Sequence, residues 1–152
     1  MNIERNYEFR KFLNTVHKKD RRNKDLLPQK NETHITDNWT ILIDENAPQL
    51  ITNVALDLQD YFFISMNVSV LLKRGNLSQN IPNVIKIATQ KEIPGAELSI
   101  PKSFEFTCKS DEIIIRACDE KGACQGSYFL EDLMNLREAP FIKQDSFIRT
   151  PA

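Results

Sequence analysis

Residues 39–73 read WTILIDENAPQLITNVALDLQDYFFISMNVSVLLK, and this stretch sets the fold class. The unbroken apolar run Ile41-Leu42-Ile43 is typical of a strand that is covered on both faces. After a turn that ends at Pro48, apolar residues recur at helical spacing and predict a helix with one apolar face, formed by Ile51, Val54, Ala55, Leu58 and Phe62. The alternating pattern of residues 67–73 predicts a second strand. A strand, a helix and a strand in succession favour a right-handed crossover.

The same kind of pattern continues toward the C-terminus. Residues 83–88, 103–108 and 112–117 predict three more strands, the last two joined as an antiparallel hairpin. In residues 117–134, ACDEKGACQGSYFLEDLM, we expect Gly122 and Gly126 to flank a turn that leads into a final helix, with Glu131 and Asp132 mainly on its solvent side. The prediction is an α+β or α/β unit: a mixed sheet with two helices packed on one face.

Three stretches organise the chain. Residues 1–37 are expected to form a charged N-terminal extension, with a short amphipathic helix from Tyr7 to about Lys24 and a polar linker over residues 26–37. The apolar side of that helix would be made of Phe9, Phe12, Leu13 and Val16. Residues 38–139 form the compact unit. Residues 140–152 have strand character and are expected to be an exit segment toward a further domain.

Composition excludes several classes of partner. The 20 basic and 21 acidic residues nearly cancel, so no overall field attracts nucleic acid or an anionic membrane. The apolar runs are far shorter than the roughly 20 residues that cross a bilayer. The N-terminal sequence MNIERNYEFRKF has charges where a signal peptide has an apolar core. We expect a soluble chain without a signal peptide, and its compartment stays open.

Catalytic and metal motifs are not expected. Three cysteines are an odd number, and the spacing from Cys118 to Cys124 is not the C-x2-C of zinc ribbons. Neither Asp119 with Glu120 nor Glu131 with Asp132 has the opposed geometry of glycoside hydrolysis. The glycine spacing matches neither a Rossmann nor a Walker loop. We therefore expect no catalytic residue, no cofactor and no metal.

One family resemblance rests on the last predicted strand, the turn after it and the start of the last predicted helix. The segment IIIRACDEKG at residues 113–122, followed by the pattern Gly126-x-Tyr128-x-Leu130-x-x-Leu133, resembles the strand, "D-x-x-G" turn and "G-x-Y-x-L" helix start of a small α/β domain. That domain precedes the catalytic (β/α)8 barrel in β-N-acetylhexosaminidases, α-glucuronidases and related glycoside hydrolases. The resemblance covers roughly residues 39–152. It implies a non-catalytic accessory domain whose partner is a barrel of the same parent chain, and such a barrel needs about 200 residues or more.

A second hypothesis is a free-standing module that binds carbohydrate or protein. Its candidate contact residues are Trp39, Phe63 and Tyr128, because aromatic rings stack on sugars and anchor interfaces. Phe63 falls beside the apolar stripe of its helix, whereas the other two have the spacing of core residues. If Phe63 is exposed near Trp39, the binding hypothesis gains.

Overall fold

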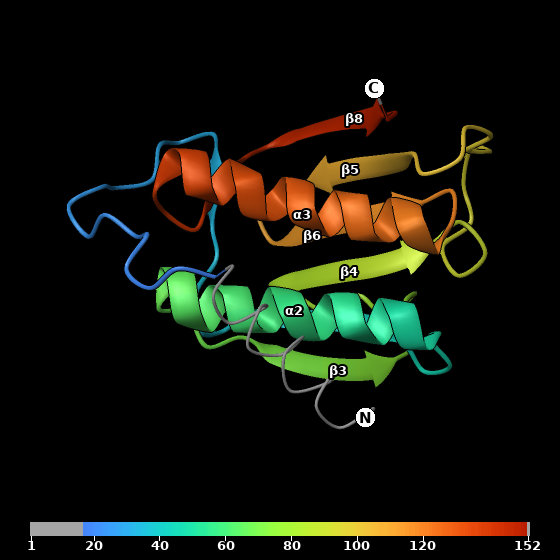
Figure 1. The fold of residues 1–152 in the computed structure, drawn as a ribbon, viewed down its shortest axis with the longest axis horizontal. Coiled ribbons are helices and arrows are strands. Elements are labelled where there is room, and N and C mark those ends of the chain that lie inside the picture. The colour runs from blue at the N-terminus through green and yellow to red at the C-terminus, as the bar shows by residue number, and fades with distance from the viewer. Residues whose placement is uncertain (1–16, 152) are drawn as a thin grey trace, which may run out of the picture.

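The computed structural model describes residues 17–151 and shows one mixed six-stranded sheet with two long helices over one of its faces (Figure 1). The spatial order of the strands is β3-β2-β4-β6-β5-β8. The neighbours from β3 to β6 pair in parallel, and β5 pairs antiparallel with β6 and with β8. This confirms the predicted mixed sheet with both helices on one face.

The predicted strand-helix-strand unit is present. Strand β2 (Thr40–Asp44) lies between β3 (Leu71–Gly75) and β4 (Val84–Thr89). Its apolar run is buried on both faces because Ile41 and Ile43 pack in the large core and Leu42 packs in a second cluster. Helix α2 (Gln49–Met66) connects β2 to β3. It ends at Asn67, whose left-handed backbone (φ 56°) lets its N–H bond the Phe62 carbonyl.

The second half of the sheet also follows the expected pattern. Strands β5 (Phe104–Cys108) and β6 (Glu112–Ala117) form the antiparallel hairpin. Helix α3 (Glu120–Arg137) then runs back beside α2 (Figure 1). The large core lies between these two helices and the sheet, where the β-branched and aromatic side chains of alternate strand positions meet the apolar stripes of the helices.

The expected turn between Gly122 and Gly126 is wrong, because both glycines lie inside α3. The Asp119 side chain caps the helix by accepting a hydrogen bond from the Gly122 N–H at 2.8 Å, so the helix begins at once after β6. Neither glycine has a positive φ. They are needed for close approach: a Cβ atom would lie 2.4 Å from the Ser103 carbonyl oxygen at residue 122 and 2.4 Å from Ile115 Cγ2 at residue 126.

The opposite face of the sheet is partly covered by loops. Leu42, Val84 and Ala88 pack there against Leu77 in a small second cluster. Further along, Arg116 is only 3% exposed. Its guanidinium donates hydrogen bonds of 2.6 Å to the carbonyls of Ile93 and of Ala96, and so holds the loop of residues 90–103 against the sheet.

Both ends of the described chain pack on this unit. Strand β1 (Glu32–His34) pairs with β7 (Phe141–Lys143) in a separate two-stranded sheet, and β8 (Asp145–Arg149) is the edge strand beside β5. The exit segment therefore has the strand character that its sequence predicts, and the expected linker contains a strand. The division into an extension, a unit and an exit segment stays a prediction.

The predicted N-terminal helix falls mostly on residues 1–16, which lie outside the described part. Over residues 17–24 the prediction is wrong, because that segment forms turns. Its backbone and side chains bond to the two long helices instead. Ser65 donates to the Lys18 carbonyl at 2.8 Å, Arg22 donates to the Met66 carbonyl at 3.2 Å, and the Asn23 N–H donates to the Glu138 carbonyl at 2.7 Å. Across residues 17–151, no helix combines the length and the apolar character that a membrane crossing requires.

Candidate functional site

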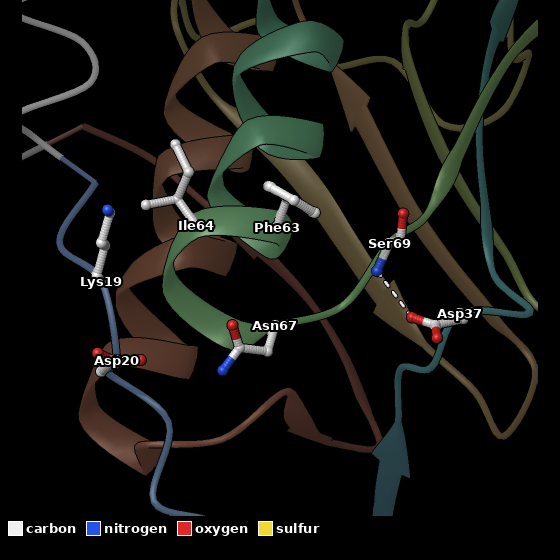
Figure 2. Close-up of a pocket in the computed structure, with 7 residues that line it drawn as sticks. All are labelled: Lys19, Asp20, Asp37, Phe63, Ile64, Asn67 and Ser69. Atoms are coloured by element: carbon white, nitrogen blue, oxygen red, sulfur yellow. Dashed lines mark hydrogen bonds between the residues drawn. The ribbon is translucent and has the colours of Figure 1, made fainter.

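A shallow pocket of about 320 Å³ opens beside the C-terminal half of α2 (Figure 2). Phe63 and Ile64 supply its apolar part. The polar groups come from Lys19 and Asp20 of the N-terminal segment, from Asp37, and from Asn67 and Ser69 after the helix. Asp37 accepts a hydrogen bond from the Ser69 N–H at 2.8 Å, which links the segment before β2 to the segment after α2.

The chemistry of this pocket suits a small polar ligand with one apolar face. Phe63 is 66% exposed, so its ring offers a flat apolar surface to solvent. Amide, carboxylate and ammonium groups around it can donate and accept hydrogen bonds. A volume of about 320 Å³ is at the lower end of the range for small-molecule sites.

The three predicted contact residues do not form one site. Phe63 lines the pocket and is exposed as expected. Trp39 is only 2% exposed, because its ring is packed in the core beneath α2, so its prediction as a carbohydrate contact is wrong. Tyr128 is 49% exposed on α3 but does not line this pocket. Phe63 is exposed, as the binding hypothesis requires, whereas Trp39, the residue expected near it, is buried.

A second polar group of residues lies buried between the two helices. His17 Nε2 is 2.7 Å from Asp57 Oδ1 of α2, and one ligand atom from each of His17, Asp57 and Glu131 fits within 4.8 Å of the others. The His17 ring also meets Tyr61 edge to face, with 5.5 Å between ring centroids. The three side chains join the N-terminal segment, α2 and α3 at one point.

The environment of this cluster changes how its carboxyl groups ionise. Burial, followed by the charge of Asp57 and a hydrogen bond with it, raises the pKa of Glu131 to about 10. Burial alone would raise the pKa of Asp57 too, but hydrogen bonds with His17 and Glu131 bring that pKa below its ordinary value. The raised pKa favours the protonated form of Glu131 at neutral pH, next to an ionised Asp57.

No sequence pattern indicates this cluster. The prediction that Glu131 lies mainly on the solvent side of the helix is wrong. Glu131 is 7% exposed, because the flank of α3 on which it lies faces α2 and His17. Helical spacing shows which side of α3 faces the sheet, but it does not show which flank a neighbouring helix will cover. His17 belonged to a charged run that is typical of a solvated segment, so no local signal pointed to its burial.

The cysteines and the acids of residues 117–134 have structural positions. Cys108 is buried on β5, Cys118 and Cys124 are half-buried, and all three are free thiols. Burial raises the pKa of the Cys108 and Cys124 thiols, which lowers their reactivity. Asp119 is the cap of α3 and also accepts a hydrogen bond from the Lys102 N–H at 3.1 Å.

Sequence comparison identifies no relatives: no protein-family model matches the chain, and no curated protein matches it. Solved structures do match the fold. The GH20 β-N-acetylhexosaminidase from Streptomyces coelicolor A3(2) is 15% identical, with a TM-score of 0.58, and the match covers 87% of this chain and 26% of the enzyme. A mutant β-hexosaminidase from Streptomyces plicatus, in complex with its product GlcNAc, is 15% identical, with a TM-score of 0.57 and the same coverage of 87% and 26%. The protein CpGH84D is 10% identical, with a TM-score of 0.55, over 80% of this chain and 21% of its own.

These matches share one property: nearly all of this chain corresponds to a small part of a larger protein. The chain spans about a quarter of the length of the hexosaminidases and about a fifth of the length of the third protein. At 10–15% identity they establish the architecture and leave the activity open. The resemblance predicted from residues 113–133 is therefore confirmed at the level of fold: this chain has the fold of a domain that occurs in β-N-acetylhexosaminidases.

Proposed function

We propose that this chain is a non-catalytic accessory domain of a glycoside hydrolase, which orients or stabilises a catalytic barrel of the same parent protein. The observation that carries this proposal is the coverage of the structural matches, 87% of this chain against 26% of the hexosaminidase from Streptomyces coelicolor. The described residues form an open six-stranded sheet, whereas a (β/α)8 barrel needs eight parallel strands in a closed ring. The catalytic part of such a parent would lie outside this chain.

The surface that suits a barrel is the outer side of the helix layer. Both helices cover the same face of the sheet, so their outward sides form one surface (Figure 1). Five of the exposed large apolar side chains lie on these helices, and we call them the outer helix face: Leu50, Leu56, Phe63, Tyr128 and Leu136. Exposed large apolar side chains are frequent at interfaces, and a contact between domains buries roughly 600–1,500 Å².

The first test of the proposal is enzymatic. The purified chain is assayed with chromogenic hexosaminides and glucuronides, and we expect no turnover because an accessory domain leaves the catalytic carboxyl groups to the barrel. Turnover that co-purifies with the chain and follows its concentration would refute the accessory role.

The second test concerns the docking surface, in the polypeptide that carries this chain in its source cells. Leu136, 85% exposed on α3, is changed to Glu, and the matched control is Leu71→Glu, at a residue 58% exposed on strand β3. We expect Leu136→Glu to lower the Tm of the parent protein, or to separate its unfolding into two transitions, while Leu71→Glu leaves the profile unchanged. Equal profiles for both variants would contradict docking through the outer helix face.

A carbohydrate-binding module is the second candidate function, and the exposed Phe63 in its polar pocket favours it. On a glycan array, the module would show saturable binding that Phe63→Ala abolishes. Tyr128→Ala is the control, because Tyr128 is a similarly exposed aromatic residue outside the pocket. An array without binding, or binding that survives Phe63→Ala, would exclude this second function.

A further inference from the structure

The cluster of His17, Asp57 and Glu131 has the donors of a metal site. It lies between α2 and α3, where the N-terminal segment crosses them. His17 is 5% exposed and Glu131 is 7% exposed, so two of the three donors are removed from water. Imidazole nitrogen and carboxylate oxygen are the ligand types that zinc and neighbouring divalent metals take in proteins.

The two carboxyl groups have acceptor atoms that the described part of the chain leaves unused. Asp57 Oδ2 and Glu131 Oε2 are buried, and no described side chain or backbone N–H donates a hydrogen bond to either. The Tyr61 hydroxyl nearby is engaged elsewhere, because it donates to Asn135 Oδ1 at 2.6 Å. Buried carboxyl oxygens without a hydrogen-bond partner are costly, and either the Glu131 proton or a bound cation between the two groups removes that cost.

The charges around the cluster also favour a cation. Asp60 of α2 lies close enough to Asp57 to feel its charge, and Asp132 of α3 does the same for Glu131. Among the described residues, no lysine or arginine forms an ion pair with Asp57 or Glu131. Asp57 and Glu131 therefore have two further carboxyl groups within range of their charges and His17 in direct contact, while the charge of Arg21 acts on the neighbouring Tyr61.

We propose that His17, Asp57 and Glu131 form a binding site for a divalent first-row metal ion of the zinc type. The donors would be Nε2 of His17 and one carboxylate oxygen from each acid, and water would complete the coordination. Donors on a tetrahedral zinc ion at about 2.0–2.2 Å lie about 3.4 Å apart. The observed donors lie within 4.8 Å of one another, and His17 Nε2 and Asp57 Oδ1 are 2.7 Å apart. Metal binding would therefore close the longest separation by at most about 1.4 Å and open the His17–Asp57 separation by about 0.7 Å.

The bound ion would fasten the N-terminal segment to the helix layer. His17 immediately precedes Lys18, whose carbonyl accepts the hydrogen bond from Ser65, and both residues reach α2 from outside the sheet. A metal that links His17 to one residue of each helix would cross-link three segments that are far apart in sequence. Because such a site forms only in the folded chain, binding would stabilise the fold.

The competing explanation is a proton in place of the metal, held between Asp57 and Glu131. The test uses the complete chain, stripped with a chelator and titrated with zinc chloride by calorimetry. We expect one zinc ion per chain and a rise in Tm, with affinity at least about tenfold weaker in Glu131→Gln, which keeps the side-chain shape but removes the anionic donor. No saturable heat and no change in Tm would mean a proton alone and would overturn the proposal.

Two controls separate this site from accidental zinc binding. His34→Gln changes the other histidine, and Cys118→Ser with Cys124→Ser removes the two half-buried thiols. These variants should bind zinc like the wild type. If they lose zinc and Glu131→Gln does not, the metal belongs elsewhere and the proposal is wrong.

A measurement on the unchanged protein avoids dependence on variants that fold poorly. The ring ¹⁵N resonances of the two histidines are followed by NMR during the zinc titration. We expect Nε2 of His17 to shift in proportion to bound zinc while the ring of His34 is unaffected. An unchanged His17 ring at saturating zinc would refute the site even if the ion binds somewhere on the chain.

Discussion

Replacement of Gly126 by alanine should destabilise the fold, although alanine is the better helix former. The added Cβ atom would lie 2.4 Å from Ile115 Cγ2, and carbon atoms prefer separations of about 3.5–4.0 Å, so about 1.1 Å of overlap must be relieved. Ile115 is fully buried, and Phe104 stands 3.3 Å away on the other side, so neither can move freely. Overpacking costs about 1–3 kcal/mol, and an overlap of about 1.1 Å between buried groups places this site at about 2–3 kcal/mol. Alanine recovers about 1 kcal/mol in helix propensity, which leaves a net loss of about 1–2 kcal/mol.

Urea unfolding measures this change as a difference in the free energy of unfolding, and Gly75→Ala is the matched control. A Cβ atom at Gly75 would meet Leu42 Cδ1 at 3.6 Å, which is an ordinary contact, so we expect that variant to stay within about 1 kcal/mol of the wild type. The double variant Gly126→Ala with Ile115→Ala should lose less than the sum of its parts, because the clashing methyl group is gone. If Gly126→Ala is as stable as the wild type, α3 does not pack against β6 as closely as the structure shows.

Three further predictions concern the two aromatic candidates, one ion pair and one loop. Trp39→Ala should lower the free energy of unfolding by about 3–5 kcal/mol, because the Trp39 ring is in the core. Phe63→Ala should change it by less than about 0.5 kcal/mol, because the Phe63 ring is exposed. Equal losses in urea unfolding would contradict this difference in burial. Glu32→Gln should cost about 1 kcal/mol at neutral pH by removing the paired hydrogen bonds from Arg137 at 2.7 and 2.9 Å. These bonds lower the pKa of Glu32 below its ordinary 4.5, so the stabilisation is present above pH 4.5 and is lost as the pH falls through the lowered pKa. If the variant is still less stable than the wild type in strong acid, the hydrogen bonds from Arg137 are not the cause. Arg116→Met should cost about 2–3 kcal/mol and speed proteolysis within residues 91–101, because two loop carbonyls lose a charged donor; an unchanged cleavage rate would show that the loop is held by other contacts.

The sequence predicts the parts of this fold that local pattern controls. The apolar run of β2, the stripe of α2 and the strand of residues 112–117 are found where periodicity places them, because each element buries one regular set of side chains. The hairpin of β5 and β6 is also local, since it needs only a short turn between two alternating runs.

Pairings between segments that are far apart in the sequence cannot be predicted from local sequence patterns. Strand β1 pairs with β7, which lies more than 100 residues later in the sequence. Residues 32–34 resemble a linker in sequence, because the residues that bury them belong to the other end of the chain. The burial of Glu131 has the same origin, since it depends on how α2 and His17 lie against α3. In the sequence, Trp39 has the spacing of a core residue and Phe63 falls beside its helix stripe, and their burial in the structure agrees with this difference.

The accessory role is tested most directly by the intact mass of the polypeptide that carries this chain in its source cells. An antibody raised against the purified chain would isolate that polypeptide for mass spectrometry. We expect a protein longer by at least about 200 residues, enough for a catalytic barrel, and the added sequence should hydrolyse glycosides. A mature polypeptide of 152 residues would contradict the accessory role, whatever the fold.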